Sequence, residues 1–125
     1  MIDSIRAKLV SVLSDVVDVY QSEAETDAYP YVVYDVTSSP VLDKDGVRGF
    51  VGDTKVRIVG VEFDVIDNLR AQVESAILSG MHDDIFFSKL NTTDKECVDG
   101  IWTIELSYTL KQYADWAQPV EQTTE

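Results

Sequence analysis

The spacing of apolar residues near the start of the chain predicts an amphipathic helix over residues 3–16. The apolar positions recur every three or four residues, which places them on one face of an α-helix. They are Ile5, Leu9, Val12, Leu13 and Val16. Asp3 is predicted to cap this helix, because its carboxylate can accept hydrogen bonds from the free backbone N–H groups of the first turn. The apolar face requires a partner surface that covers it.

The central stretch, residues 54–80, predicts a strand that passes with almost no linker into a second amphipathic helix. The strand pattern is clearest in VRIVGVEF, residues 56–63. Asp64 is predicted to cap the helix, Asp67 adds negative charge to its first turn, and Gly80 supplies a permissive end. The apolar stripe of this helix consists of Val65, Ile66, Leu69, Val73, Ala76 and Ile77. The junction therefore predicts a helix that lies back across a sheet.

Two segments between these helices predict strands. Residues 17–20, VDVY, form a short β-prone patch before the polar stretch QSEAETDA, which has loop composition. Residues 29–37, YPYVVYDVT, are rich in β-branched and aromatic side chains. Pro30 cannot donate to a strand ladder, so it is expected at the beginning of this strand or on an edge. One face of the strand carries Val32, Tyr34 and Val36, the other carries Tyr31, Val33 and Asp35, and at least one of the two is predicted to be buried.

The later part of the chain predicts a β-hairpin. Residues 85–90 have strand composition, with a continuation through residues 92–96, and Asp99-Gly100 is a dipeptide favoured in tight hairpin turns. Residues 101–113 then alternate between apolar and polar side chains. The core-facing set is Trp102, Ile104, Leu106, Tyr108 and Leu110. Because burying one such side chain contributes about 1.5–3 kcal/mol, this strand is expected to dominate the core.

Residues 38–53, SSPVLDKDGVRGFVGD, lie between two predicted strands and form a segment too long for a simple turn. Pro40 and three glycines favour irregular backbone, whereas the apolar side chains argue against a solvated linker. We therefore expect an extended arm or hairpin that docks on a neighbouring molecule.

Together these elements predict an α+β fold. We expect a single antiparallel or mixed β-sheet of about four to five strands, with two α-helices packed on one face and a long loop or β-hairpin arm. Residues 1–113 are expected to form one domain and residues 114–125 a flexible C-terminal tail. Trp116 is the exception in this tail. We expect this large aromatic side chain to pack on the body of the protein or on a partner, because packing removes its apolar surface from water.

The charge balance narrows the possible partners. The chain has 23 acidic and 10 basic side chains, for a formal charge of −13, which disfavours binding to nucleic-acid phosphates or anionic lipid. Its apolar runs are far shorter than the ~20 residues that span a bilayer, and its start lacks the pattern of a secretory signal. Cys97 is the single cysteine, which favours a reducing compartment and cytoplasmic synthesis.

None of the chemically active residues forms a recognisable catalytic or metal-binding motif. The triplet His82-Asp83-Asp84 is interpreted as a solvated turn, because neighbouring side chains rarely converge on one ion. Residues 43–46, DKDG, lack the glycine position and closing glutamate of an EF-hand loop. A Cys97–His82 pair would need an oxyanion hole and a third orienting group, which no motif marks. We predict no catalytic residue, no metal site and no cofactor.

The order of elements resembles the tail completion, or tail terminator, proteins of long-tailed bacteriophages. The resemblance is carried by the helix over residues 3–16, the strand entry AYPYVVY at residues 28–34, and the strand VRIVGVEF that runs directly into a helix. The helix positions Leu69, Val73 and Ile77 and the closing pair of strands complete the pattern. It covers residues 3–113, and the chain departs from it in its acidity and its additional C-terminal tail.

This resemblance implies a small structural subunit that performs no chemistry and forms a homo-oligomeric ring, commonly a hexamer. Such a ring caps the tail tube of the virion and joins it to the head connector, after assembly in the host bacterial cytoplasm. DNA would pass through the ring without specific binding, and no membrane is involved. An acidic surface is compatible with such a DNA conduit.

The expected contacts with other subunits lie in the segment 38–53 and near the end of the chain. The candidate interface residues are Val41, Leu42, Val47, Arg48, Phe50, Val51, Tyr113 and Trp116. Two alternatives remain open. One is another component of the phage neck, such as a head–tail connector or stopper. The other is a small enzyme or ligand-binding module with a pocket between the sheet and the helices.

Overall fold

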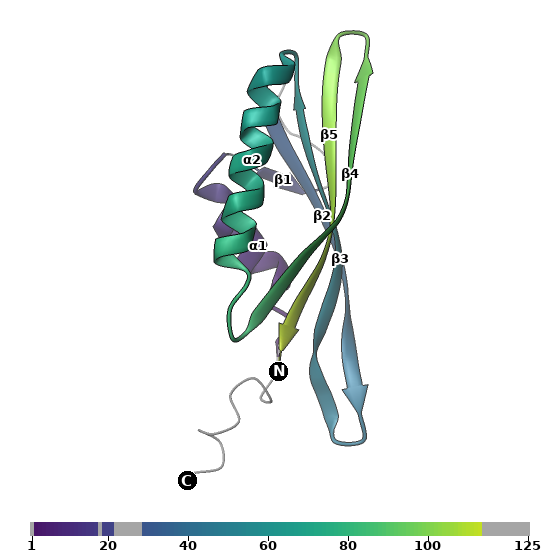
Figure 1. Cartoon of the computed structure of the whole chain (residues 1–125). Coiled ribbons are helices and arrows are strands. Elements are labelled where there is room, and N and C mark those ends of the chain that lie inside the picture. The colour runs from purple at the N-terminus through teal and green to yellow at the C-terminus, as the bar shows by residue number, and fades with distance from the viewer. Residues whose placement is uncertain (1, 18, 22–28, 114–125) are drawn as a thin grey trace.

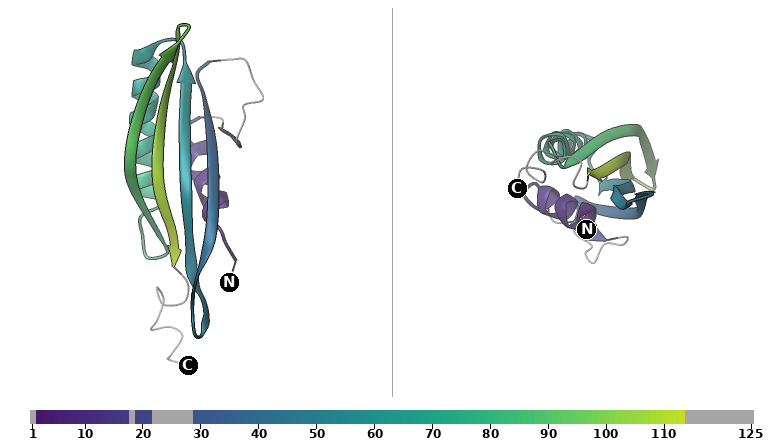
Figure 2. Two further views of the ribbon diagram at one scale, coloured as in Figure 1. Left: turned by 90° about the vertical axis from the view of Figure 1, so that its right-hand side faces the viewer. Right: turned by 90° about the horizontal axis from the view of Figure 1, so that it is seen from below.

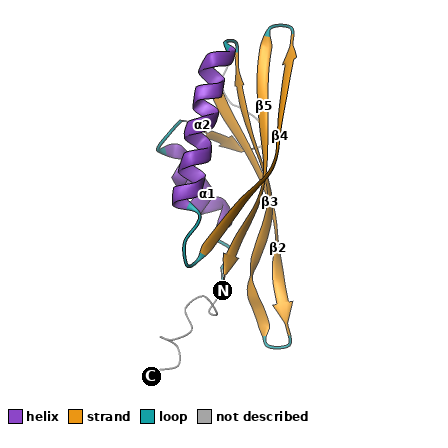
Figure 3. Ribbon diagram, in the orientation of Figure 1, coloured by secondary structure: helices purple, strands orange, loops and turns teal. Residues whose placement is uncertain are grey.

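A mixed β-sheet carries both helices on one of its faces (Figures 1 and 3). The computed structural model describes residues 2–17, 19–21 and 29–113. The elements within these residues are α1 (Ile5–Ser14), β1 (Val19–Gln21), β2 (Tyr31–Asp43), β3 (Gly46–Gly60), α2 (Phe63–Gly80), β4 (Phe86–Val98) and β5 (Ile101–Tyr113). The predicted α+β fold is confirmed. The predicted tail, residues 114–125, lies outside the described residues.

The described strands form one five-stranded sheet in the order β1-β2-β3-β5-β4. Neighbouring strands pair antiparallel, except that β1 pairs parallel with β2. Figure 2 shows the long strands running the length of the molecule, and its right-hand view places both helices on the same side of the sheet. The sheet therefore has a helix-covered inner face and an open outer face.

The core lies between the inner face of the sheet and the two helices, and β5 crosses its centre. The predicted alternation in β5 is confirmed, with the strand bounds as predicted. Its buried inner side chains are Ile104, Leu106, Tyr108 and Leu110. The helices contribute Ile5, Leu9, Leu13, Ile66, Leu69, Val73 and Ile77. Each of these aliphatic side chains stabilises the fold by about 1.5–3 kcal/mol through the loss of water-exposed apolar surface.

Helix α1 is shorter than predicted at its start. Its N-cap is Ser4 and not Asp3, although the Asp3 Oδ1 atom accepts a hydrogen bond of 3.0 Å from the backbone N–H of Ile5. Asp3 thus satisfies a free donor of the first turn from one position earlier than a standard cap. Val12 and Val16 are partly buried against the core, as their place in the apolar stripe predicts.

Helix α2 begins at Phe63, and Glu62 is its N-cap without a side-chain cap hydrogen bond, so the prediction that Asp64 caps the helix is wrong. Phe63 is partly buried, and its ring contacts the Trp102 ring edge-on with centroids 4.9 Å apart. Burying this aromatic side chain offsets the loss of a capping bond. Strand β3 correspondingly ends at Gly60, three residues before the predicted end.

The apolar stripe of α2 is confirmed at four positions, Ile66, Leu69, Val73 and Ile77. Val65 is 42% exposed and does not belong to the core, which corrects its assignment to the stripe. Asp67 lies beyond the first turn and pairs with Arg70. The helix ends at Gly80 as predicted, where a Cβ atom would lie 2.5 Å from the Val12 Cγ2 atom of α1.

The predicted arm over residues 38–53 is a β-hairpin in which β2 continues to Asp43 and β3 begins at Gly46. Two of the three glycines, Gly49 and Gly52, do not lie in turns. Each lies within β3 where a neighbouring element approaches closely, which is compatible with a regular hairpin strand. The short first strand also differs from its prediction: β1 covers Val19–Gln21. The second hairpin joins β4 and β5 at Asp99 and Gly100, both with positive φ, as the predicted tight turn requires.

Candidate assembly interface

The hairpin of β2 and β3 extends beyond the end of β5 as an arm, residues 41–48 (Figure 1). Gly49 pairs with Tyr113, the last residue of β5. The arm residues beyond this point pair only with one another among the described strands. Residues 41–48 are all exposed, so their side chains are available to a partner.

The arm is closed by a tight turn at Lys44 and Asp45. The backbone N–H of Asp45 donates a 2.7 Å hydrogen bond to the Asp43 Oδ1 atom, a turn in which a carboxylate replaces a backbone acceptor. Gly46 follows with a φ of 115°, a conformation that disfavours other residues. The Arg48 Nε atom lies 2.6 Å from the Asp43 Oδ2 atom, so the predicted interface residue Arg48 forms an ion pair across the arm.

The arm presents an apolar patch on one of its faces. Leu42 pairs with Val47 and Pro40 pairs with Phe50, and cross-strand partners lie on the same face. Leu42 is 65% exposed and Val47 is 40% exposed. Val41 is 43% exposed and lies on the opposite face of the arm by strand alternation. The structure thus brings Leu42 and Val47 together and separates Val41 from them.

The remaining predicted interface residues lie at the base of the arm. Phe50 is partly buried against the core and Val51 is half-buried, so both contribute to the folded chain itself. Tyr113 is half-buried, and its backbone N–H donates a 2.7 Å hydrogen bond to the Ile85 carbonyl oxygen. Trp116 lies outside the described residues. The exposed part of the predicted interface is therefore concentrated in residues 41–48.

The chain start is held against the base of the arm by Gln112, the β5 partner of Phe50. The Gln112 side chain is 6% exposed. Its Oε1 atom accepts a 2.6 Å hydrogen bond from the Ser4 N–H, and its Nε2 atom donates a 3.0 Å bond to the Ile2 carbonyl oxygen. The Ser38 hydroxyl also donates to the Asp3 carboxylate. These bonds connect the start of α1 to the strands from which the arm extends.

A second exposed apolar surface, which was not predicted from the sequence, is a groove between α2 and β4. Its volume is about 280 Å³, and it is lined by Glu74, Ser75, Leu78, Ser88, Leu90 and Tyr108. Leu78 is 62% exposed and Leu90 is 36% exposed. In the sequence, this surface could have been indicated by Leu78, an apolar side chain that falls outside the apolar stripe of its helix. Its partner across the groove became visible only when the fold placed β4 beside α2.

The negative charge of Glu74 in this groove is partly compensated by Arg70, which also pairs with Asp67. The Glu74 Oε2 atom lies 2.5 Å from the Arg70 Nη1 atom. Burial raises the pKa of the Tyr108 phenol, and the negative charge of Glu74 raises it further, so the hydroxyl remains protonated. The groove therefore presents two leucines beside groups that carry little net charge.

The outer face of the sheet is polar and hollowed. A hollow of about 470 Å³ is lined by Asp35, Thr37, Asp53, Thr54, Lys55, Asn91, Ser107 and Tyr108. Glu105 lies near two cations on this face, 3.9 Å from the Lys55 Nζ atom and 4.0 Å from an Arg57 nitrogen. Small-molecule sites reach similar volumes but have mainly apolar walls. The composition of this hollow is that of a solvated sheet face.

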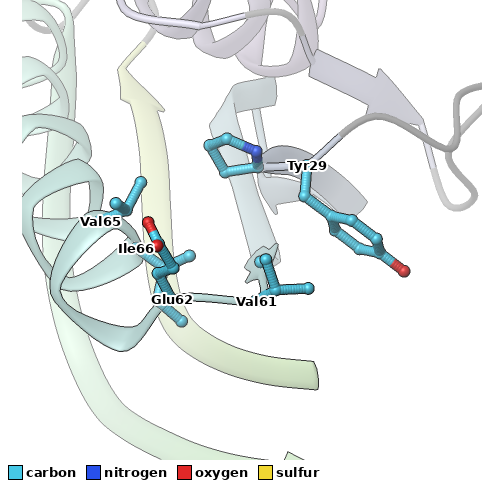
Figure 4. A pocket seen from close by; sticks show the side chains of 7 residues that line it. Tyr29, Val61, Glu62, Val65 and Ile66 are labelled. Carbon is cyan, nitrogen blue, oxygen red and sulfur yellow. The ribbon is translucent and has the colours of Figure 1, made fainter. Parts of the chain in front are cut away.

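The strand-to-helix junction carries a small pocket of about 70 Å³ between the start of β2 and the start of α2 (Figure 4). Glu62 and Val65 lie on one side of it, and the Tyr29 ring points away from them. Free backbone N–H groups at a helix start attract anions. Here the carboxylates of Glu62 and Asp64 lie at that position and repel negative ligands.

Of the side chains considered above for chemistry, Asp83 and His82 make structural contacts. Backbone hydrogen bonds from Phe86 and then Ile85 lower the pKa of the Asp83 carboxyl, which closes the turn before β4. His82 contacts the Phe87 ring. Cys97 lies near the far end of β4, about 35 Å along the strand from this turn. Within residues 2–17, 19–21 and 29–113, no group of three or more His, Cys, Asp or Glu side chains is arranged to hold a metal ion.

Neither described helix has the length and apolar composition needed to cross a membrane.

Comparison with known proteins adds information at the level of the fold. No protein-family model and no curated protein matches the chain. Among solved structures, it is similar to a protein chain of the virion of the native gene transfer agent (GTA) particle, with a TM-score of 0.61 and 17% sequence identity. This match covers 85% of this chain and 84% of that chain.

A second similar structure is the bacteriophage SPP1 gp17 protein, at a TM-score of 0.43 and 19% identity, with 83% of this chain and 88% of that chain covered. This likeness is too weak to carry a conclusion. The likeness to the GTA chain shows a shared fold that extends over most of both chains.

Proposed function

We propose that this chain is a structural subunit of a phage-like virion in the region where the tail joins the head. Within that region we assign it the role of tail terminator, or tail completion, subunit. The proposal rests most directly on the fold shared with a GTA virion chain over 84% of that chain. The finer role rests on the resemblance of the order of strands and helices to tail completion proteins of long-tailed bacteriophages.

In this role, several copies form a ring, in the family commonly a hexamer, that caps the tail tube and joins it to the head connector. The exposed patch of Leu42 and Val47 supports a role in protein contacts, because a chain that acts alone gains nothing from apolar side chains at the end of an arm. The formal charge of −13 keeps DNA phosphates from adhering as they pass. The role requires no chemical step and no cofactor.

The experiment is deletion of the gene from the genome that encodes the chain, followed by electron microscopy of the particles. A tail terminator stops growth of the tail tube, so we expect headless tails that are longer than normal. A connector or stopper would instead leave tails of normal length beside unjoined heads. Normal joined particles would contradict every version of the proposal.

Complementation separates the role of the arm from the presence of the protein. A plasmid copy of the natural chain is expected to restore normal tails, and a copy with Leu42→Asp and Val47→Asp is expected to fail. The matched control is Thr103→Asp, which places a carboxylate on the outer face of the sheet away from the arm. Failure of the control as well would indicate sensitivity to added charge in general.

The size of the outer hollow, about 470 Å³, is compatible with a second candidate, a small ligand-binding module, whereas its polar walls argue against one. Its volume falls within the ~300–1,000 Å³ common for small-molecule sites. Thermal unfolding with nucleotides and divalent metals tests this candidate. A saturable rise in the melting temperature, lost in Lys55→Ala, would favour it over the structural role.

A further inference from the structure

The arm is a neutral surface, and the groove between α2 and β4 is a weakly charged one, on a strongly acidic molecule. In residues 41–48, Asp43 and Asp45 are balanced by Lys44 and Arg48, whereas the whole chain carries a formal charge of −13. Beside the groove, Arg70 pairs with both Glu74 and Asp67, so this cluster carries one net negative charge. Two copies of an acidic chain repel one another through most of their surface. Contacts between copies are therefore favoured where the local charge cancels.

Both surfaces also expose aliphatic side chains. The arm presents Leu42 and Val47 from two paired strands, and the groove presents Leu78 and Leu90 from a helix and a strand. Covering such side chains removes apolar surface from water at about 25 cal/mol per Å². The arm is a narrow two-stranded projection, and the groove is an open depression of about 280 Å³. A projection and a depression are complementary in shape.

The arm of one copy does not reach the groove of the same copy. Tyr108 at the floor of the groove is paired with Thr54 of β3, and Val47 lies seven residues from Thr54 along that strand. At about 3.3 Å per residue the separation is roughly 23 Å. Because β3 is held between β2 and β5 from Gly49 to Thr54, the arm is directed away from the groove of its own copy. The occupant of the groove must come from another molecule.

We infer that the arm of one copy packs its Leu42 and Val47 face into the α2–β4 groove of a second copy. The contact is heterologous, because each copy contributes its arm to one neighbour and its groove to another. Repetition of such a contact closes into a ring when the rotation permits. This inference rests on the proposed ring-forming function and specifies which two surfaces of the subunit make the ring contact.

Directed disulfide formation between two different single-cysteine variants tests the inference. In a Cys97→Ser chain, Val47→Cys places a thiol on the arm and Leu78→Cys places one in the groove. The two proteins are mixed at high concentration, oxidised and analysed on a non-reducing gel. All three positions are exposed, and circular dichroism checks the fold of each variant. A second pair, Leu42→Cys with Leu90→Cys, replaces the first if either variant fails to fold.

The expected result is a disulfide dimer in the mixture, at a yield about fivefold or more above a mixture of Val47→Cys with Ser107→Cys, because a specific contact raises the effective concentration of the two thiols. Ser107 lies on the outer face of the sheet and serves as the matched control. A dimer formed by Val47→Cys alone would indicate an arm–arm contact, and a dimer of Leu78→Cys alone a contact between grooves. Either result, or a yield equal to the control, overturns the inference.

The particle phenotype decides the proposed function separately. If gene deletion produces long tails but the mixture does not cross-link, the chain is a terminator that uses other surfaces for its ring. If the mixture cross-links and deletion leaves joined tails of normal length, the arm–groove contact is real and the proposed function is wrong.

Discussion

At the scale of single residues, the base of the arm depends on a close backbone approach at Gly49. A Cβ atom at this position would lie 2.3 Å from the backbone carbonyl oxygen of Gln112. This carbonyl belongs to the same residue whose side chain holds Ser4 and Ile2. A backbone atom in the middle of a sheet cannot move away as a flexible side chain can. Gly49 is therefore required for strand spacing, and its role is not conformational freedom.

We predict that Gly49→Ala lowers the free energy of unfolding by about 2 kcal/mol, because the methyl group forces β3 and β5 apart. Urea unfolding followed by circular dichroism measures this change. Gly100→Asn is the control. Nothing lies within 4 Å of a Cβ atom at Gly100, and asparagine tolerates its positive φ. A loss in the control as large as that of Gly49→Ala would show that the close approach is not the cause.

At the scale of elements, the arm is separable from the structure that carries it. Its residues pair with one another, and its large side chains are exposed. The core depends instead on the inner face of β5 and on the helices. An element that contributes little to the core but exposes Leu42 and Val47 is expected to affect assembly more than stability.

Replacing residues 42–48 with Asn-Gly, which joins Val41 directly to its partner Gly49 through a tight turn, tests this separation. The free energy of unfolding is expected to change by less than about 1 kcal/mol, because few buried contacts are lost. Assembly into larger species, measured by analytical ultracentrifugation, is expected to disappear. A chain that unfolds on shortening, or that assembles as before, would contradict the assignment of the arm to subunit contacts.

At the scale of the whole molecule, the acidic charge opposes the association of copies. A formal charge of −13 on 125 residues produces repulsion between copies. The neutral arm and the weakly charged groove reduce this repulsion locally, but the remainder of the surface still opposes close approach. Repulsion between exposed charges is screened by salt, whereas apolar contacts are not weakened by it.

We therefore predict that assembly of the purified chain increases with ionic strength. Raising the salt from about 0.1 M to about 1 M shortens the Debye length from ~10 Å to ~3 Å and should increase the assembled fraction. Sedimentation at fixed protein concentration measures this fraction, and sucrose at matched density serves as the control for solution effects. Dissociation at high salt would mean that ion pairs, and not apolar side chains, hold the copies together.

The fold class and most elements were predictable from local patterns. The alternation from Ile101 to Tyr113 has one solution, because a shift of one residue would expose the whole apolar set. The dipeptide Asp99-Gly100 similarly specifies a turn with positive φ at both residues. The start of α2 was not predictable, because the burial of Phe63 against Trp102 outweighs the capping preference of Asp64. The position at which this helix begins is thus decided by a contact with a residue distant in sequence.

The sequence by itself determined the sheet, the helices on one face and an apolar segment at residues 38–53, because hydrophobic periodicity and turn chemistry act over short distances. Tertiary structure decided that this segment is a hairpin and not another form of extended arm, because the close contact at Gly49 depends on Gln112 of β5 and that at Gly52 on Ile5 of α1. It also decided that Leu78 and Leu90 line one groove. Surfaces composed of several elements exist only after packing, so the candidate contact between copies is a property of the fold and not of a motif.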